Sequence, residues 1–172
     1  MITVSVLLPE YLYQWALHNL DARVVDGRKI VFPVKGSPLS HFLRNFLRHK
    51  FKKPDDSKMN ISHGAIPLET EELLIQVPHF PGRDPEYYNY LSFTAEAQLR
   101  DLIRSRFDLA LFTEFSRFDN VAMNKNDFIF SWLDANGIDQ KEKNWLAVDK
   151  RLQLLNRRSL DRKRKMNVKS FS

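Results

Sequence analysis

The spacing of apolar residues predicts alternating strands and helices at the start of the chain. Ile2–Leu8 is rich in β-branched residues and has apolar side chains at both parities, a pattern typical of a strand buried on two faces. Pro9 ends this strand, and Tyr11–Leu20 then carries apolar residues at helical spacing. The Asp26-Gly27 pair between two short apolar runs predicts a β-hairpin, because both turn positions favour positive φ.

A second helix and a fourth strand follow this hairpin. Ser37-Pro38 predicts a helix start, with serine as the N-cap and proline in the first turn, and the apolar stripe continues to about Lys50. Residues 52–70 form a long polar connection to Glu72–Val77, which predicts a strand. The order β-α-β-β-α-β over residues 1–80 is that of a ferredoxin-like domain, so the predicted fold class is α+β.

Beyond a linker at residues 79–85, the pattern predicts helices only. Thr94–Phe118 is one long helix with apolar residues near a 3.6-residue period. Asp127–Ala135 is a shorter helix, and Asn136-Gly137 ends it because glycine adopts the left-handed conformation at this position. The last helix begins near Gln140. The predicted division is a ferredoxin-like domain at 1–80, a three-helix domain at 86–160 and a frayed basic tail at 161–172.

The last two helices resemble a helix-turn-helix hairpin in their order and in the glycine of the turn. In this interpretation Asn144 and Gln153 are the side chains able to pair with base edges. The segment Asp139–Glu142, where base contacts of a recognition helix normally fall, is acidic and mixed, which is unfavourable for phosphates. A plain helical hairpin inside a bundle is the alternative interpretation of the same pattern.

Composition narrows the function classes. The chain of 172 residues is 43% hydrophobic and 28% charged and contains no cysteine, so disulfides, thiolate zinc sites and cysteine nucleophiles are excluded. No apolar run approaches the roughly 20 residues of a membrane span, and a cytoplasmic protein is expected. The five histidines are scattered, no phosphate-binding or nucleophile motif is present, and we expect no metal, no cofactor and no enzymatic activity.

Charge is the strongest functional signal. Residues 150–172 contain nine Lys or Arg and one acid, a net charge of +8, whereas the whole chain carries +6 and residues 1–149 therefore carry −2. A near-neutral body with a basic end is typical of a nucleic-acid anchor, and also of a solvated tail. The candidate phosphate-binding residues are Lys150, Arg151, Arg157, Arg158, Arg162, Lys163, Arg164 and Lys165.

A second basic cluster at Arg44–Lys53 adds Arg44 and Arg48 to these candidates. The outer face of an amphipathic helix is the alternative explanation of this cluster. Four aromatic residues could stack bases, but packing at the domain junction is the favoured explanation, because Arg83 is the only basic residue interleaved with them in the sequence. These aromatic residues are Tyr87, Tyr88, Tyr90 and Phe93.

The leading hypothesis is a non-enzymatic nucleic-acid-binding protein, a regulator or a replication or mobile-element accessory factor, that anchors DNA or RNA phosphates with its basic C-terminal helix and tail. The alternative is a protein-interaction or self-association module. In that alternative, the apolar stripe of the last helix pairs with another helix. The stripe consists of Trp145, Val148, Leu152 and Leu155.

Overall fold

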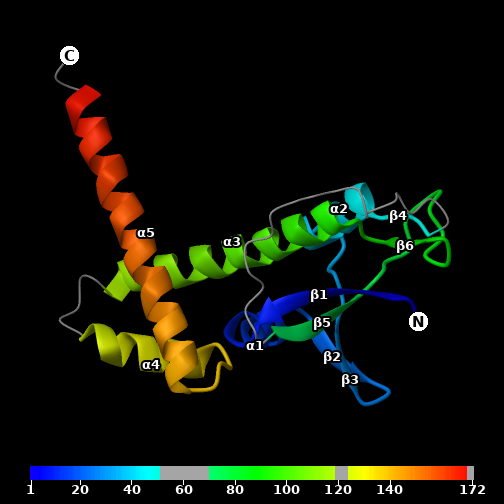
Figure 1. Cartoon of the computed structure of the whole chain (residues 1–172), viewed down its shortest axis with the longest axis horizontal. Coiled ribbons are helices and arrows are strands. Elements are labelled where there is room, and N and C mark those ends of the chain that lie inside the picture. The colour runs from blue at the N-terminus through cyan, green and yellow to red at the C-terminus, as the bar shows by residue number, and fades with distance from the viewer. Residues whose placement is uncertain (51–69, 119–123, 170–172) are drawn as a thin grey trace. The chain divides into compact units, whose positions relative to one another are not determined.

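The computed structural model describes residues 1–50, 70–118 and 124–169, with the side chains of the last helix described as far as residue 161 (Figure 1). It has a mixed α+β fold and divides into two compact units, Met1–Arg104 and Ser105–Ser172. The boundary falls inside the long helix α3 (Phe93–Phe118), so each unit contains one part of this helix.

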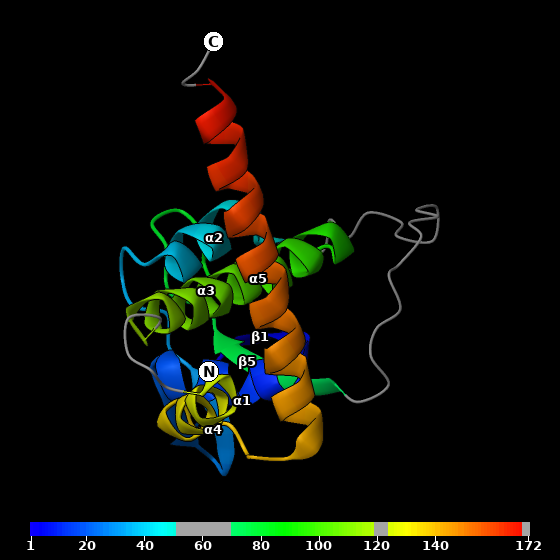
Figure 2. The same cartoon turned by 90° about the vertical axis from the view of Figure 1, so that its left-hand side faces the viewer.

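The first unit contains a four-stranded sheet and a two-stranded ribbon. The sheet has the strand order β1-β5-β3-β2, and helix α1 contacts all four of its strands (Figure 2). The ribbon pairs β4 with β6. The elements that precede α3 are β1 (Thr3–Pro9), α1 (Glu10–Asn19), β2 (Ala22–Val25), β3 (Arg28–Val31), α2 (Pro38–Phe46), β4 (Arg48–His49), β5 (Thr70–Gln76) and β6 (Tyr88–Tyr90).

Local signals in the first unit are confirmed. Asp26 and Gly27 both have positive φ, 50° and 75°, and they connect β2 to β3 as the hairpin prediction requires. Ser37 caps α2, because its Oγ accepts a hydrogen bond from the Ser40 amide at 3.2 Å, and Pro38 occupies the first turn.

The strand order corrects the ferredoxin-like prediction. In that fold the first strand lies between the third and the fourth, whereas here β5 lies between β1 and β3. β5 pairs antiparallel with β1 and parallel with β3, so the sheet is mixed. Element order alone does not fix these pairings, because they join segments far apart in the sequence.

Two further predictions about this unit were wrong. β1 is buried on one face only, since it is an edge strand and its residues alternate between buried Val4 and Val6 and exposed Ser5 and Leu7. α2 ends at Phe46 rather than near Lys50, because the chain becomes extended and forms β4. The predicted polar connection at residues 52–70 lies outside the described residues, except for Thr70.

The second unit packs the C-terminal part of α3 with α4 (Lys125–Ala135) and α5 (Glu142–Lys169). Two edge-to-face aromatic pairs join α3 to α4, Phe107 with Trp132 and Phe115 with Phe128, each with ring centroids 5.2 Å apart. Val148 and Leu152 of α5 are fully buried. The three helices predicted for this part of the chain are therefore present, and each begins within two residues of its predicted start. The predicted end of the last helix near residue 160 was wrong, because α5 continues to Lys169 through most of the segment predicted as a frayed tail.

The turn after α4 is a Schellman motif. Gly137 has a φ of 65°, and its amide donates to the Asp134 carbonyl at 3.1 Å. The Ile138 amide donates to the Leu133 carbonyl at 2.9 Å, and the Ile138 side chain is buried. Together these bonds satisfy the carbonyls at the end of α4 and confirm the predicted stop at Asn136-Gly137.

Candidate nucleic-acid interface

The exposed face of α5 carries basic residues at intervals of seven. Asn144, Val148 and Leu152 form the buried face of this helix. Lys150 lies about 160° from the centre of that face at 3.6 residues per turn, and Arg157 lies about 180° from it. Seven residues rise about 10.5 Å, so the two side chains form a line along the helix that points away from the core.

Lys150, Arg157 and Arg158 are all exposed, and no carboxylate among the described residues forms an ion pair with any of them. Two other arginines of the second unit differ in this respect: Arg151 pairs with Asp108, and Arg117 pairs with Glu114 at 2.8 Å. Cations without a protein counter-charge are the ones that can exchange solvent ions for phosphates. These three residues therefore form the described part of the basic face of α5.

Arg151 has a different role, although it is adjacent to Lys150. Its guanidinium makes a two-pronged ion pair with Asp108 of α3, with Nε 2.6 Å from Oδ1 and Nη2 2.5 Å from Oδ2. The two side chains are only 23% and 14% exposed. Arg151 therefore joins α5 to α3 within the second unit, and a phosphate would have to compete with Asp108 for it.

The predicted residues Arg162, Lys163, Arg164 and Lys165 lie within α5, which continues to Lys169. Their side chains lie outside the described set. At seven-residue spacing, Arg164 follows Arg157 on the helix.

The two residues predicted to pair with base edges differ in burial: Asn144 is buried, whereas Gln153 is exposed. Asn144 is 2% exposed, and its Nδ2 donates to the Asp139 carbonyl at 3.0 Å, which holds the start of α5 against the preceding turn. Gln153 donates from Nε2 to Asp149 Oδ2 at 2.6 Å. The Asn144 side chain is therefore unavailable to a base.

The α4–α5 hairpin differs from a helix-turn-helix in its connection. Six residues, Asn136–Lys141, separate the two helices, whereas that motif has three or four. Besides this connection, an ion pair joins the two helices: Lys125 Nζ at the start of α4 lies 2.8 Å from Asp149 Oδ1 of α5.

The apolar stripe predicted for self-association belongs to the core of the second unit. Val148 and Leu152 are fully buried, and Trp145 and Leu155 are half-buried. Among the described side chains of α5, the exposed large apolar ones are instead Leu146 and Leu160, which are 49% and 57% exposed.

Arg44 and Arg48 lie in the first unit and are both exposed. Arg48 is in β4, opposite Tyr90 of β6, and the backbone carbonyl of Arg44 accepts a hydrogen bond from Arg83 Nη1. The neighbouring lysines of this predicted cluster, Lys52 and Lys53, lie outside the described residues. The structure thus brings Arg48 of the basic cluster next to Tyr90 of the aromatic cluster. The sequence does not show this proximity, because about 40 residues separate the two clusters.

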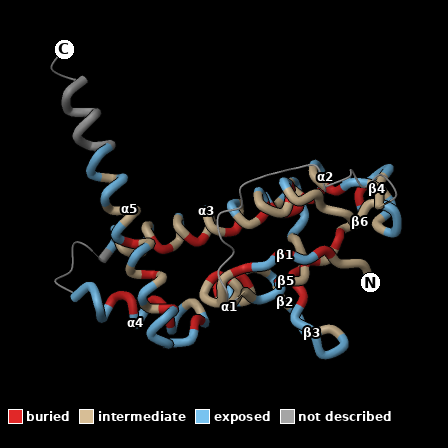
Figure 3. Tube along the Cα trace, in the orientation of Figure 1, coloured by how far each residue is buried: buried red, intermediate tan, exposed pale blue. Residues whose placement is uncertain are grey.

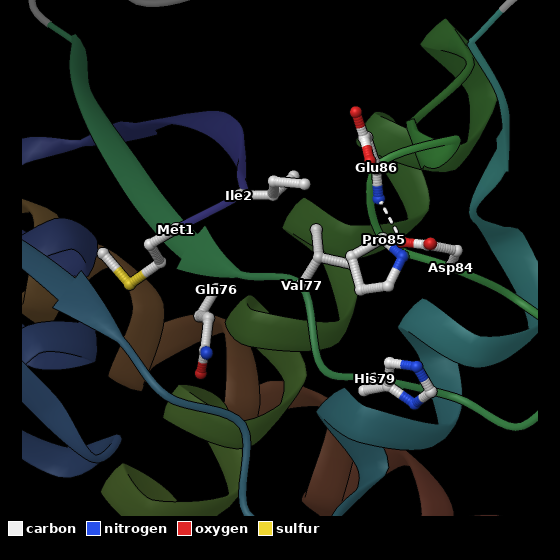
Figure 4. A pocket seen from close by; sticks show the side chains of 8 residues that line it. All are labelled: Met1, Ile2, Gln76, Val77, His79, Asp84, Pro85 and Glu86. Carbon is white, nitrogen blue, oxygen red and sulfur yellow. Dashed lines mark hydrogen bonds between the residues drawn. The ribbon is translucent and has the colours of Figure 1, made fainter.

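A cleft of about 690 Å³ lies beside the ends of β1 and β5 and includes His79, Asp84 and Glu86 in its lining (Figure 4). Asp84 Oδ1 accepts a hydrogen bond from the Glu86 amide at 2.9 Å, so this carboxylate stabilises the local turn. His79 makes no hydrogen bond or ion pair with the described residues, and the cleft therefore contains no paired acid and base. No group of three metal-ligating side chains is found in the described part of the chain.

Comparison with known proteins gives no family, since no protein-family model, curated protein or solved structure matches the chain. Over residues 1–50, 70–118 and 124–169, no helix is both long and apolar enough to cross a membrane.

Proposed function

We propose that this chain is a non-enzymatic nucleic-acid-binding protein that anchors phosphates along the exposed face of α5. The observation that carries the proposal is the line formed by Lys150 and Arg157, opposite the buried face of the helix. Phosphate contacts supply most of the salt-dependent affinity of such proteins without reading sequence.

The same face supports anchoring rather than base reading. The segment that leads into α5 is acidic and mixed, and Asn144 is buried against it. Apart from Lys143 in the first turn, the basic residues of α5 begin two turns later, at Lys150, and continue to Lys169. A regulator or a replication or mobile-element accessory factor that needs general affinity for DNA or RNA fits this arrangement.

A salt titration of binding tests the proposal. If four to six cations contact phosphates, the logarithm of the affinity for a 20-base-pair duplex should fall with the logarithm of the salt concentration at a slope of about −4 to −5. Replacing Lys150 and Arg157 together by Gln should reduce the steepness by about 2, since each phosphate contact contributes about 1.

The matched control replaces Arg28 and Lys29 by Gln. These residues are exposed at the tip of the β2–β3 hairpin, and the change in net charge is the same. The control variant should keep the wild-type slope. Absence of binding at about 50 mM salt, or an equal loss in both double variants, would contradict the proposal.

Self-association through α5 is the second candidate, and the exposure of Leu146 and Leu160 favours it. These residues are fourteen apart and lie on one side of the helix, where a second helix could cover both. Light scattering distinguishes the two states: a wild-type dimer that becomes a monomer on Leu160→Asp would support this candidate, and a monomeric wild type would exclude it.

A further inference from the structure

The β4–β6 ribbon combines exposed cations with aromatic rings. Arg48 is opposite Tyr90, His49 is opposite Tyr88, and the Lys50 amide donates to the Tyr87 carbonyl at 2.8 Å. Figure 1 shows the ribbon beyond the end of α2, and Figure 3 colours it as half-buried and exposed. Two segments of the first unit, distant in the sequence, thus form one small surface.

The rings and cations of this surface contact one another directly. The His49 ring stacks on Tyr87 with centroids 5.8 Å apart and an angle of 11° between planes, and it meets Tyr88 edge-on at 5.3 Å. Lys50 Nζ lies 5.4 Å from the centre of the Tyr87 ring, and the Arg83 guanidinium lies 5.8 Å from the centre of the Tyr88 ring. Aromatic faces held beside cations can take up both a base and its phosphate.

Core packing does not account for Tyr87. The aromatic core residues Trp15 and Phe80 of the same unit are 4% and 8% exposed, whereas Tyr87 is 43% exposed. Its ring is held in place by His49 and by the ribbon backbone rather than by burial. A half-exposed ring that stacks on His49 beside the Lys50 ammonium offers aromatic surface of the kind on which a base can stack.

We propose that this ribbon binds single-stranded nucleic acid, with a base adding to the His49–Tyr87 stack and the exposed Arg44 and Arg48 contacting the backbone. The inference rests on the proposed function and specifies its substrate class. A duplex offers no free base face, because its bases already stack on each other, so stacking selects single strands and unpaired loops.

Fluorescence anisotropy with a labelled 15-nucleotide single-stranded DNA and with the matching duplex tests the inference. Tyr87→Ala should weaken single-strand binding by roughly 5- to 150-fold, the range that corresponds to one lost stacked base. Duplex binding through α5 should change by less than about 2-fold, and Tyr87→Phe should retain wild-type affinity, because phenylalanine preserves the aromatic face.

Phe130→Ala is the control, because Phe130 of α4 is also 43% exposed and its ring packs against Trp145, with no cation of the described residues over it. Circular dichroism on each variant verifies that the fold is retained. Equal losses from Tyr87→Ala and Phe130→Ala, or no loss from Tyr87→Ala, would overturn the inference while leaving duplex binding in place. If the wild type binds neither DNA, the proposed function itself fails.

Discussion

The ion pair between Arg151 and Asp108 leads to a prediction that separates structural from functional cations on α5. Both oxygens of Asp108 accept hydrogen bonds from Arg151, at 2.6 and 2.5 Å, and both side chains are largely shielded from solvent. Bidentate arginine–carboxylate pairs of this kind are stronger than single contacts between exposed charges. Arg151 should therefore contribute to the stability of the second unit and very little to nucleic-acid affinity.

The magnitude follows from the exposure of the pair. Fully exposed pairs contribute about 0.2–1 kcal/mol, whereas removing one member of a fully buried pair costs about 3–5 kcal/mol. At 23% and 14% exposure the pair is intermediate and retains some solvent screening. We expect Asp108→Ala to lower the free energy of unfolding by about 2 kcal/mol, with a coupling energy of about 1–2 kcal/mol between the two residues.

Urea unfolding of the wild type, both single alanine variants and the double variant measures this coupling. The same variants are then titrated with duplex DNA across salt concentrations. Arg151→Ala should leave the slope of the salt dependence nearly unchanged, whereas Arg157→Ala should reduce it by about 1. A coupling energy below about 0.3 kcal/mol, or a slope change for Arg151→Ala as large as that for Arg157→Ala, would refute the reasoning.

Three further variants test the turns and one surface pair. Gly137→Ala should lower the free energy of unfolding by about 1–2 kcal/mol in urea, since the residue has a φ of 65°, and an unchanged midpoint would contradict this. Asn144→Ala should cost about 1–3 kcal/mol in the same assay by removing the buried donor to the Asp139 carbonyl. The hydrogen bond from Arg23 lowers the pKa of Asp21, so the stability that the pair provides is present above the ordinary aspartate pKa and is lost as pH falls through the folded-state pKa. Asp21→Asn should therefore lose less stability on acidification than the wild type, as thermal unfolding between about pH 5 and pH 2 will measure.

Features set by neighbouring residues were predictable from the sequence. The Asp26-Gly27 turn, the Ser37 cap and the Gly137 helix stop each depend on a few adjacent residues whose backbone preferences are strong. The three C-terminal helices were also predicted, because their apolar periods extend over several turns.

Strand pairing was not predictable in the same way. From its sequence, β5 could pair with β1, with β2 or with β3. Nothing in Thr70–Gln76 shows that β1 and β3 are its neighbours in the sheet. The apolar side chains at both parities of β1 suggested burial on two faces, yet Leu7 is exposed because an edge strand covered by one helix buries only one face. The β4–β6 ribbon was missed for a related reason, since two or three residues in each strand carry no periodic signal.

The basic C-terminal end shows how charge counts and charge availability differ. The sequence counts Arg151 with Lys150 and Arg157, but one residue changes its direction on a helix by about 100°, and this rotation turns Arg151 toward Asp108. Lys150 and Arg157 lie on the side of α5 opposite its buried face, where no described carboxylate neutralises them. The net charge of +8 thus overstates the cations available to phosphates, because it includes Arg151, which Asp108 neutralises. For this reason the salt slope of the Lys150 and Arg157 variants, compared with that of Arg151→Ala, is the measurement that decides whether α5 is a phosphate anchor.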